Sequence, residues 1–329
     1  MKIVYYFLLA IIFTLIGWAG KTFWDLKYTS GVYQTISKGV INTPKPLEKY
    51  SIENLSSANI KPGKIEVNEN KFIFEFSPDL SGKTKKVSGS INIPEGDGPF
   101  PIIVMFRGFI DQTIYKTGMG TVRVAEYFSK NGFITIAPDF LGYADSDKEA
   151  ENIFESRFQT YVTALSLLKS IESPSFAKAT EGKSDINNVM IWGHSNGGQI
   201  ALTALEVTRA NYPTVLWAPV SEPFPYSILY YTDESADKGK FIRSELAKLE
   251  KDYDVEKYSL SNYLDRINAP IQIHQGTNDD AIPLKWTTNL DKVLNDSDLI
   301  IHTGADHDMR PVWDLAVTQS LQFYKKYLK

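Results

Sequence analysis

The stretch NVMIWGHSNGGQIALTALEVT, residues 188–208, decides the fold of this chain. Residues 189–192 are apolar and predict a buried strand, which leads without a spacer into the pentapeptide GHSNG, residues 193–197. Apolar residues then recur at helical spacing as far as Thr208. The pattern is therefore that of a strand, a G-x-S-x-G turn and a helix.

Ser195 stands at the tip of this turn. A strand that turns directly into a helix passes through a strained backbone conformation, and the flanking glycines let the two elements approach each other closely. Because the helix begins at once, its free N–H groups and the positive end of its dipole point toward the oxygen that Ser195 attacks. We interpret Ser195 as a nucleophile. The alternative is a glycine-rich turn with a serine that caps the helix.

The composition excludes several classes of function. The 329 residues include 43% hydrophobic and 22% charged side chains, as in a globular protein, and the net charge of -4 gives no basic surface for nucleic acid. The chain has no cysteine, which removes disulfides, thiolate catalysis and cysteine-bound zinc. We expect neither a metal nor an organic cofactor.

The first residues predict a membrane segment. Residues 3–20 carry no charge and are long enough to nearly cross a bilayer core, so residues 1–24 are expected to be a transmembrane anchor or a signal peptide. The aromatic residues at its end favour the anchor. The catalytic domain is therefore expected to be membrane-anchored or secreted, and extracytoplasmic. Residues 25–62 are polar and without a sustained period, which indicates a tether and an irregular lead-in.

Residues 63–329 predict one α/β domain. Three β-rich segments between 64 and 93 read as antiparallel strands, and from residue 102 onward unbroken apolar strands alternate with helices. This alternation predicts a mostly parallel, doubly wound sheet with helices on both faces. Residues 219–264 exceed a simple crossover and are interpreted as a helical cap, with an extended crossover helix as the alternative. The loop at 173–185 reads as an exposed insertion.

A serine nucleophile needs a base, and only four histidines are available. His194 adjoins Ser195 but points away from it, whereas His274 and His302 fall within predicted strands and are expected to be packed there. His307 lies in a polar loop before the last helix and is the candidate base. The histidine needs a carboxylate, and Asp279 follows a strand at the same sheet edge, with Asp280 as the second choice.

The oxyanion of an attacked carbonyl group needs two donors. We expect them to be the backbone N–H groups of Asn196 and of Phe109, which follows a strand ending at residue 106. Arg107 is expected to hold this loop, to bind a substrate carboxylate or to form an ion pair with Asp111.

Aromatic residues of the cap are candidates for an apolar acyl pocket, among them Phe224, Tyr226, Tyr230 and Tyr231. Glu222 is a candidate for binding a substrate amine. The alternative for Glu222 is a solvated residue of the cap.

Four motifs together resemble a known superfamily: WGHSNGG, QGTNDDAIP, GADHDM and APDFLGYADSD. They are similar to the elbow, acid turn, histidine loop and post-strand turn of α/β-hydrolases, most closely the catalytic domains of the prolyl oligopeptidase family and the dienelactone-hydrolase-like esterases. The likeness covers residues 64–329 and implies a Ser195–Asp279–His307 triad. Two departures are the Arg107-Gly108-Phe109 sequence, where these peptidases usually have His-Gly-Gly, and the missing propeller.

The sequence thus predicts a serine hydrolase that cleaves an ester or a peptide-type acyl bond through an acyl-enzyme on Ser195. Its expected substrate is a small ester or a short peptide. Competing hypotheses are a peptidase of the prolyl oligopeptidase type, an acyltransferase that passes the acyl group to an alcohol or amine, and a non-catalytic, membrane-tethered binding protein.

Overall fold

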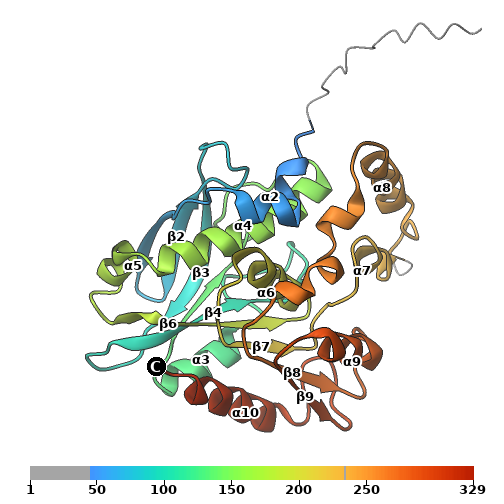
Figure 1. The fold of residues 1–329 in the computed structure, drawn as a ribbon. Coiled ribbons are helices and arrows are strands. Elements are labelled where there is room, and N and C mark those ends of the chain that lie inside the picture. Colours follow the sequence, from blue (N-terminus) through green and yellow to red (C-terminus); the bar gives the residue numbers. More distant parts are fainter. Residues whose placement is uncertain (1–44, 233–234) are drawn as a thin grey trace, which may run out of the picture. The chain divides into compact units, whose positions relative to one another are not determined.

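A nine-stranded sheet runs through the part of the chain that the computed structural model describes, residues 45–232 and 235–329 (Figure 1). It belongs to one compact unit, Pro46–Lys329. The strand order is β1-β2-β3-β5-β4-β6-β7-β8-β9. The strands are β1 (Lys64–Asn68), β2 (Lys71–Phe76), β3 (Lys85–Asn92), β4 (Phe100–Phe106), β5 (Ile134–Pro138), β6 (Ser184–His194), β7 (Thr214–Trp217), β8 (Ile271–Gly276) and β9 (Ser297–His302).

The pairing of the strands confirms the predicted fold class. β1, β2 and β3 pair antiparallel, and β3 pairs antiparallel with β5. All other neighbours, from β5 through β4 and β6 to β9, pair parallel. The sheet is therefore mostly parallel with antiparallel strands from the N-terminal side.

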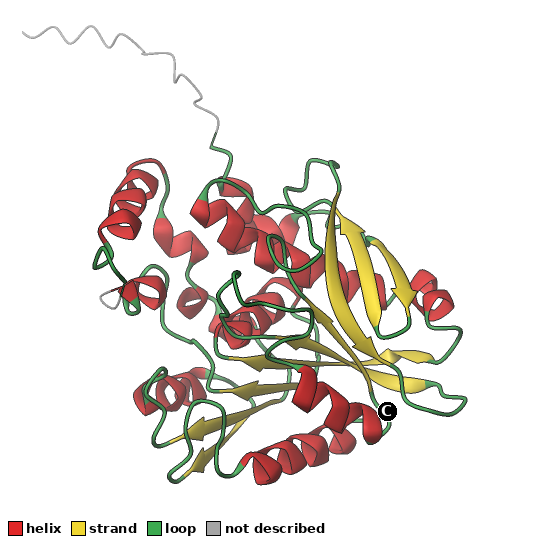
Figure 2. Cartoon of the chain, turned by 180° about the vertical axis from the view of Figure 1, so that it is seen from behind, coloured by secondary structure: helices red, strands yellow, loops and turns green. Residues whose placement is uncertain are grey.

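Helices cover both faces of the sheet (Figure 2). The longer ones are α3 (Val122–Lys130), α4 (Ile153–Ile171), α6 (Asn196–Thr208), α8 (Lys240–Asp252), α9 (Leu284–Val293) and α10 (Trp313–Lys326). Side chains of β4 alternate between two cores: Val104 packs with α4 and α6, whereas Met105 packs with α3 and α10. Both are fully buried, as parallel strands between two helical layers require.

The lead-in differs from the expectation. The described part of residues 25–62 contains the 3₁₀-helix η1 (Glu48–Tyr50) and the helix α2 (Ile52–Ser57), whose N-terminus is capped by Ser51. Tyr50, Ile52 and Leu55 are each 1% exposed. A helix of one and a half turns is too short to show a sequence period, so the irregular lead-in predicted for these residues is wrong for residues 48–57.

The loop at 173–185 is also more ordered than expected. It contains α5 (Pro174–Ala179), and β6 begins at Ser184. Phe176 is 0% exposed and fixes the helix to the core, so this segment is not an exposed insertion.

Between β7 and β8 the described part of the chain forms helices of different lengths. They are α7 (Tyr226–Leu229), α8 and the 3₁₀-helices η3 (Val255–Tyr258), η4 (Leu260–Asn262) and η5 (Leu264–Arg266). This is the segment in which the sequence predicts a helical cap.

Residues 1–24, for which the sequence predicts an anchor or a signal peptide, lie outside the described residues. Within residues 45–232 and 235–329, none of the helices has both the length and the hydropathy needed to cross a membrane.

Candidate active site

The turn between β6 and α6 holds Ser195 in a strained conformation. Its φ of 54° and ψ of -121° lie where a residue with a side chain is rarely found. The Ser195 N–H donates to the Trp217 carbonyl at 3.0 Å, and the Val220 N–H donates to the Ser195 carbonyl at 3.0 Å. Both peptide groups of the serine are therefore fixed by the neighbouring strand and the segment that follows it.

Two glycines make this sharp turn possible. A Cβ atom at Gly197 would overlap the carbonyl oxygen of Phe106, and one at Gly193 would lie 2.7 Å from the carbonyl oxygen of Gly197. The start of α6 thus lies too close to β4 for a side chain at Gly197, and too close to the end of β6 for one at Gly193.

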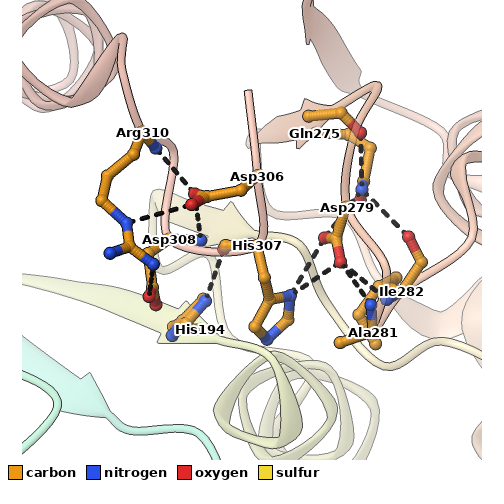
Figure 3. A network of polar contacts seen from close by, with 10 residues as sticks. His194, Gln275, Asp279, Ala281, Ile282, Asp306, His307, Asp308 and Arg310 are labelled. Carbon is orange, nitrogen blue, oxygen red and sulfur yellow. Dashed lines mark hydrogen bonds and ion pairs between the residues drawn. The ribbon is translucent and has the colours of Figure 1, made fainter. Parts of the chain in front are cut away.

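His307 and Asp279 are hydrogen-bonded to each other (Figure 3). Nδ1 of His307 lies 3.0 Å from Oδ2 and 3.1 Å from Oδ1 of Asp279. The Asp279 side chain is 0% exposed, whereas that of His307 is 22% exposed. The carboxylate also accepts the N–H groups of Ala281 and Ile282 at 2.9 and 2.8 Å and the Gln275 amide at 3.0 Å.

These contacts set the charge of Asp279. Burial alone raises the pKa of the carboxyl group, but the hydrogen bonds from His307, Ile282 and Gln275 more than offset it, and the net pKa is lowered. Asp280, the second choice for the acid, is exposed and has no hydrogen bond to His307 among the described residues.

The histidine loop is held from two sides. Nε2 of His194 lies 3.0 Å from the carbonyl oxygen of His307, and the two rings are 4.7 Å apart. Asp306 accepts the N–H groups of Asp308 and Arg310 at 3.0 and 2.8 Å and so closes the loop on itself (Figure 3). The loop therefore lies directly against the residue that precedes Ser195.

The hydroxyl group of Ser195 has no hydrogen-bond partner among the residues that the structure describes. A Cβ atom added at Gly108 would lie 3.5 Å from its Oγ, so the hydroxyl group faces the loop after β4. Hydrogen bonds between nucleophile and base are often long or absent without substrate and tighten when substrate binds.

The remaining histidines are structural, as predicted from their positions. His274 is 0% exposed, and its Nδ1 lies 2.9 Å from Nε2 of His302. Burial and the neighbouring His302 lower the pKa of His274 to about 3. Burial and the neighbouring His307 lower the pKa of His194 to about 4, so these rings are neutral at pH 7.

The loop after β4 and the first turn of α6 carry the two N–H groups that the sequence predicts as oxyanion donors. Phe109 is 77% exposed, and its N–H group donates no hydrogen bond within the described part of the chain. Asn196 is the first residue of α6, where backbone N–H groups have no intrahelical acceptor. Both N–H groups are free for a ligand oxygen.

Arg107 does not form the predicted ion pair with Asp111. It is 5% exposed, and it donates to the Gly108 and Asp139 carbonyl groups, each at 2.9 Å. Its guanidinium group also lies 4.0 Å from the centre of the Tyr143 ring. Asp111 instead accepts from Thr113, and Arg107 therefore holds the loop.

The cap aromatics divide into two groups. Phe224 is 2% exposed and packs edge-on against Phe158, so it belongs to the core and is not free to contact a substrate. Tyr226 is half exposed and lies 6.2 Å from Trp286. The spacing of residues in the sequence could not distinguish the buried Phe224 from the half-exposed Tyr226, because both belong to the same aromatic run.

Glu222 is half-buried. Burial raises the pKa of its carboxyl group, and Lys285 partly offsets this effect.

Two cavities border the Ser195 elbow. One, of about 220 Å³, is lined by both candidate oxyanion residues and by α4 side chains that the sequence analysis did not single out, including Arg157. The other, of about 530 Å³, is lined by His194 and by Trp192, Trp217 and Trp313. Arg157 was missed because its helix reads as a core helix whose polar positions face solvent.

No cluster of three or more histidine, aspartate or glutamate side chains suited to a metal ion is present within residues 45–232 and 235–329. The chemistry available at the elbow is that of the serine, the imidazole, the carboxylate and the backbone N–H groups.

Comparison with known proteins gives one family. The model of the prolyl oligopeptidase family matches residues 121–329, more than half of the chain. Comparison with curated protein sequences gives no match.

Solved structures share the fold. Est1E from Butyrivibrio proteoclasticus with bound ferulic acid is 17% identical, with a TM-score of 0.55 over 74% of this chain and 95% of that one. Acetyl xylan esterase 1 from Thermoanaerobacterium is 15% identical, with a TM-score of 0.60 over 85% and 94%.

A putative dipeptidyl aminopeptidase IV from Bacteroides ovatus is 14% identical, with a TM-score of 0.54 over 80% of this chain and 36% of that one. At these identities the similarity shows the fold alone, and it confirms the predicted α/β-hydrolase fold.

Proposed function

This chain belongs to the prolyl oligopeptidase family of serine hydrolases, and from that premise we propose that it cleaves a small carboxylic ester through an acyl-enzyme on Ser195. In the proposed mechanism, Nε2 of His307 takes the proton of the Ser195 hydroxyl group as its oxygen attacks the carbonyl carbon. The N–H groups of Phe109 and Asn196 stabilise the resulting oxyanion.

His307 then gives the proton to the leaving group, and the acyl group stays on Ser195. A water molecule, deprotonated by the same histidine, attacks the acyl-enzyme and releases the acid. Asp279 holds the Nδ1–H tautomer of His307 throughout and stabilises the imidazolium ion.

One observation carries the proposal. The 3.0 Å hydrogen bond between His307 and a fully buried carboxylate belongs to a loop that lies against the neighbour of Ser195. A solvated loop histidine is not expected to be oriented by a buried carboxylate. Here that carboxylate is itself held in place by three further N–H groups.

The test compares wild type with Ser195→Ala on p-nitrophenyl esters and aminoacyl-anilides. We expect turnover to fall about 10⁶-fold, as when other serine nucleophiles are lost, with unchanged thermal unfolding. A fluorophosphonate probe is expected to label wild type only. A folded wild type that does not label and matches the alanine variant in rate would indicate a non-catalytic binding protein.

A peptidase acting on short peptides is the second candidate, because of the position of Glu222. The segment 220–222 starts beside the elbow, since the Val220 N–H donates to the Ser195 carbonyl at 3.0 Å. A half-buried carboxylate there is suited to a substrate amine. If this candidate is right, aminoacyl-anilides are cleaved faster than esters, and Glu222→Gln lowers only the anilide rate.

A further inference from the structure

We propose that the 220 Å³ cavity beside Asn196 and Phe109 binds an acyl chain that ends in a carboxylate, and that Arg157 recognises this carboxylate. The inference rests on the proposed function and names the substrate class of the same site: half-esters of short dicarboxylic acids. Arg157 is then a specificity-determining residue, and it takes no part in the chemical step.

The cavity combines an apolar wall with two cationic side chains. Its apolar side chains come from Phe140, Leu141, Ile153 and Ile200. Its cations are Arg107 and Arg157. The chain as a whole has a net charge of -4, so a cavity with more positive than negative side chains does not follow from its composition.

Arg157 has unused hydrogen-bonding capacity. A guanidinium group has five N–H donors, and the described contacts of Arg157 use one, from Nη2 to the Gln199 side-chain oxygen at 2.5 Å. Its Nε is buried without a hydrogen-bond partner, and no described carboxylate lies within 4.0 Å of its nitrogens. Leaving a buried charged donor unpaired is unfavourable, whereas a carboxylate accepts two parallel N–H groups from one guanidinium group.

The other charged groups of the cavity have more partners, although Nε of Arg107 is buried without one, like that of Arg157. Arg107 donates to two backbone carbonyl groups and stacks on Tyr143. Glu149 is exposed and accepts from Gln112 at 2.8 Å and from Ser156. Arg157 makes one described hydrogen bond against two for Arg107, and it is therefore the cation with more N–H groups left for a ligand.

Gln199 links Arg157 to the catalytic end of α6. Gln199 is 1% exposed and stands three residues after Asn196, one helical turn from the expected oxyanion donor. A short acyl chain can thus link a carboxylate bound by Arg157 to the scissile carbonyl group.

The cavity takes the acyl side of the substrate and not the leaving group. His307 must protonate the leaving group, which therefore lies on the histidine side of Ser195. The lining residues all come from residues 107–163 and 196–200, and none comes from the histidine loop. A group in this cavity consequently remains attached to Ser195 in the acyl-enzyme.

The test uses two esters that differ only at the end of the acyl chain: monoethyl glutarate, which ends in a carboxylate, and ethyl pentanoate, which ends in a methyl group. Hydrolysis is followed by acid release in wild type, Arg157→Met and Arg209→Met. Arg209 is an exposed arginine at the far end of α6, so its variant loses the same charge outside the cavity.

We expect wild type to prefer the glutarate ester in kcat/KM. Arg157→Met is expected to lower kcat/KM for glutarate about 30-fold or more, as for the loss of one partner of a desolvated charge pair, and to change pentanoate less than about threefold. Arg209→Met is expected to change neither. Equal loss on both esters, or no preference in wild type, overturns the inference.

A second measurement does not depend on the variant folding. Free glutarate is expected to inhibit wild-type hydrolysis of ethyl pentanoate more strongly than free pentanoate does, and equal inhibition contradicts the inference. If wild type cleaves the pentanoate ester without preferring glutarate, this inference fails and the proposed function stands. If neither ester is cleaved and Ser195 does not label with fluorophosphonate, both fail.

Discussion

At the scale of single residues, two adjacent aspartates of one turn have different surroundings. Asp279 is buried and accepts hydrogen bonds from His307, Ala281, Ile282 and Gln275. Asp280 is exposed. Because the two carboxylates are neighbours in the chain, Asp280 provides a matched control for Asp279.

Asp279→Asn is expected to lower kcat about 10⁴-fold, because an amide no longer selects the Nδ1–H tautomer or stabilises the imidazolium ion. Asp280→Asn is expected to keep kcat within about twofold, as surface substitutions usually do. Steady-state kinetics on the preferred ester measures both. If Asp280→Asn loses as much activity as Asp279→Asn, the assignment of the acid is wrong.

The sequence could place Ser195 at a sharp strand-to-helix turn because that turn requires a local pattern of glycines, strand and helix. It could not identify Arg157, because the cavity joins segments near residues 107, 157 and 196 that are distant in the chain. The sequence also could not show that Phe224 is a core residue. An aromatic residue in the cap segment is compatible with substrate binding and with packing, and only the fold shows that Phe224 packs against Phe158.

At the scale of elements, β8 and β9 carry a buried pair of histidines. The rings of His274 and His302 are parallel, with an angle of 6° between them and 5.2 Å between their centres. Burial and the neighbouring His302 lower the pKa of His274 to about 3, and burial lowers that of His302. Both rings are neutral in the folded protein at pH 7.

This pair predicts acid-sensitive stability. Histidines in the unfolded chain have a pKa near 6.5, so between pH 6.5 and about 3 the unfolded state binds more protons than the folded state. The stability is complete above pH 6.5 and falls as the pH is lowered, by up to about 1.4 kcal/mol per pH unit for His274. His194, with a pKa of about 4, adds to the same slope.

Urea unfolding at pH 7.5, 6.5 and 5.5 measures this slope. The double variant His274→Asn, His302→Asn is expected to show a shallower one over the same range. NMR signals of the His274 ring are expected not to titrate between pH 7.5 and 5. A midpoint near 6.5 for that ring would show that the pair is not held neutral by burial.

Long elements were predictable and short ones were not. The strands of the parallel sheet and the helices α4, α6 and α10 each give a run of apolar residues long enough to show a period. α2 and α5 have six residues each and are fixed by one or two buried side chains, Ile52 and Leu55 in α2 and Phe176 in α5. Their existence depends on tertiary packing, which no local pattern reports.

At the scale of the whole compact unit, residues 47–53 form hydrogen bonds and an ion pair with residues that are distant in the sequence. The Leu47 carbonyl accepts from the Tyr258 hydroxyl group at 3.1 Å, and Glu53 forms an ion pair with Arg266. Tyr50 donates to Glu155 at 3.0 Å. Residues 46–57 thus pack on α4 and on the segment that returns from the cap to β8.

This packing predicts different outcomes for two truncations. A chain that begins at Lys45 keeps every contact that η1 and α2 make with other described residues, and we expect its unfolding free energy and its kcat/KM to match those of the full chain. A chain that begins at Pro62 loses five buried apolar side chains, Leu47, Tyr50, Ile52, Leu55 and Ile60, and uncovers the surfaces against which they pack.

Each of these side chains contributes about 1.5–3 kcal/mol by burial, so the second truncation is expected to lose about 5 kcal/mol or more. This loss approaches the whole stability of an ordinary domain, about 5–15 kcal/mol. Urea unfolding followed by circular dichroism compares the two truncations. Leu55→Ala in the longer chain serves as a graded control, with an expected loss of about 2–5 kcal/mol. If the chain that begins at Pro62 unfolds at the same urea concentration as the longer one, residues 46–61 are an accessory segment and contribute nothing to the stability of the fold.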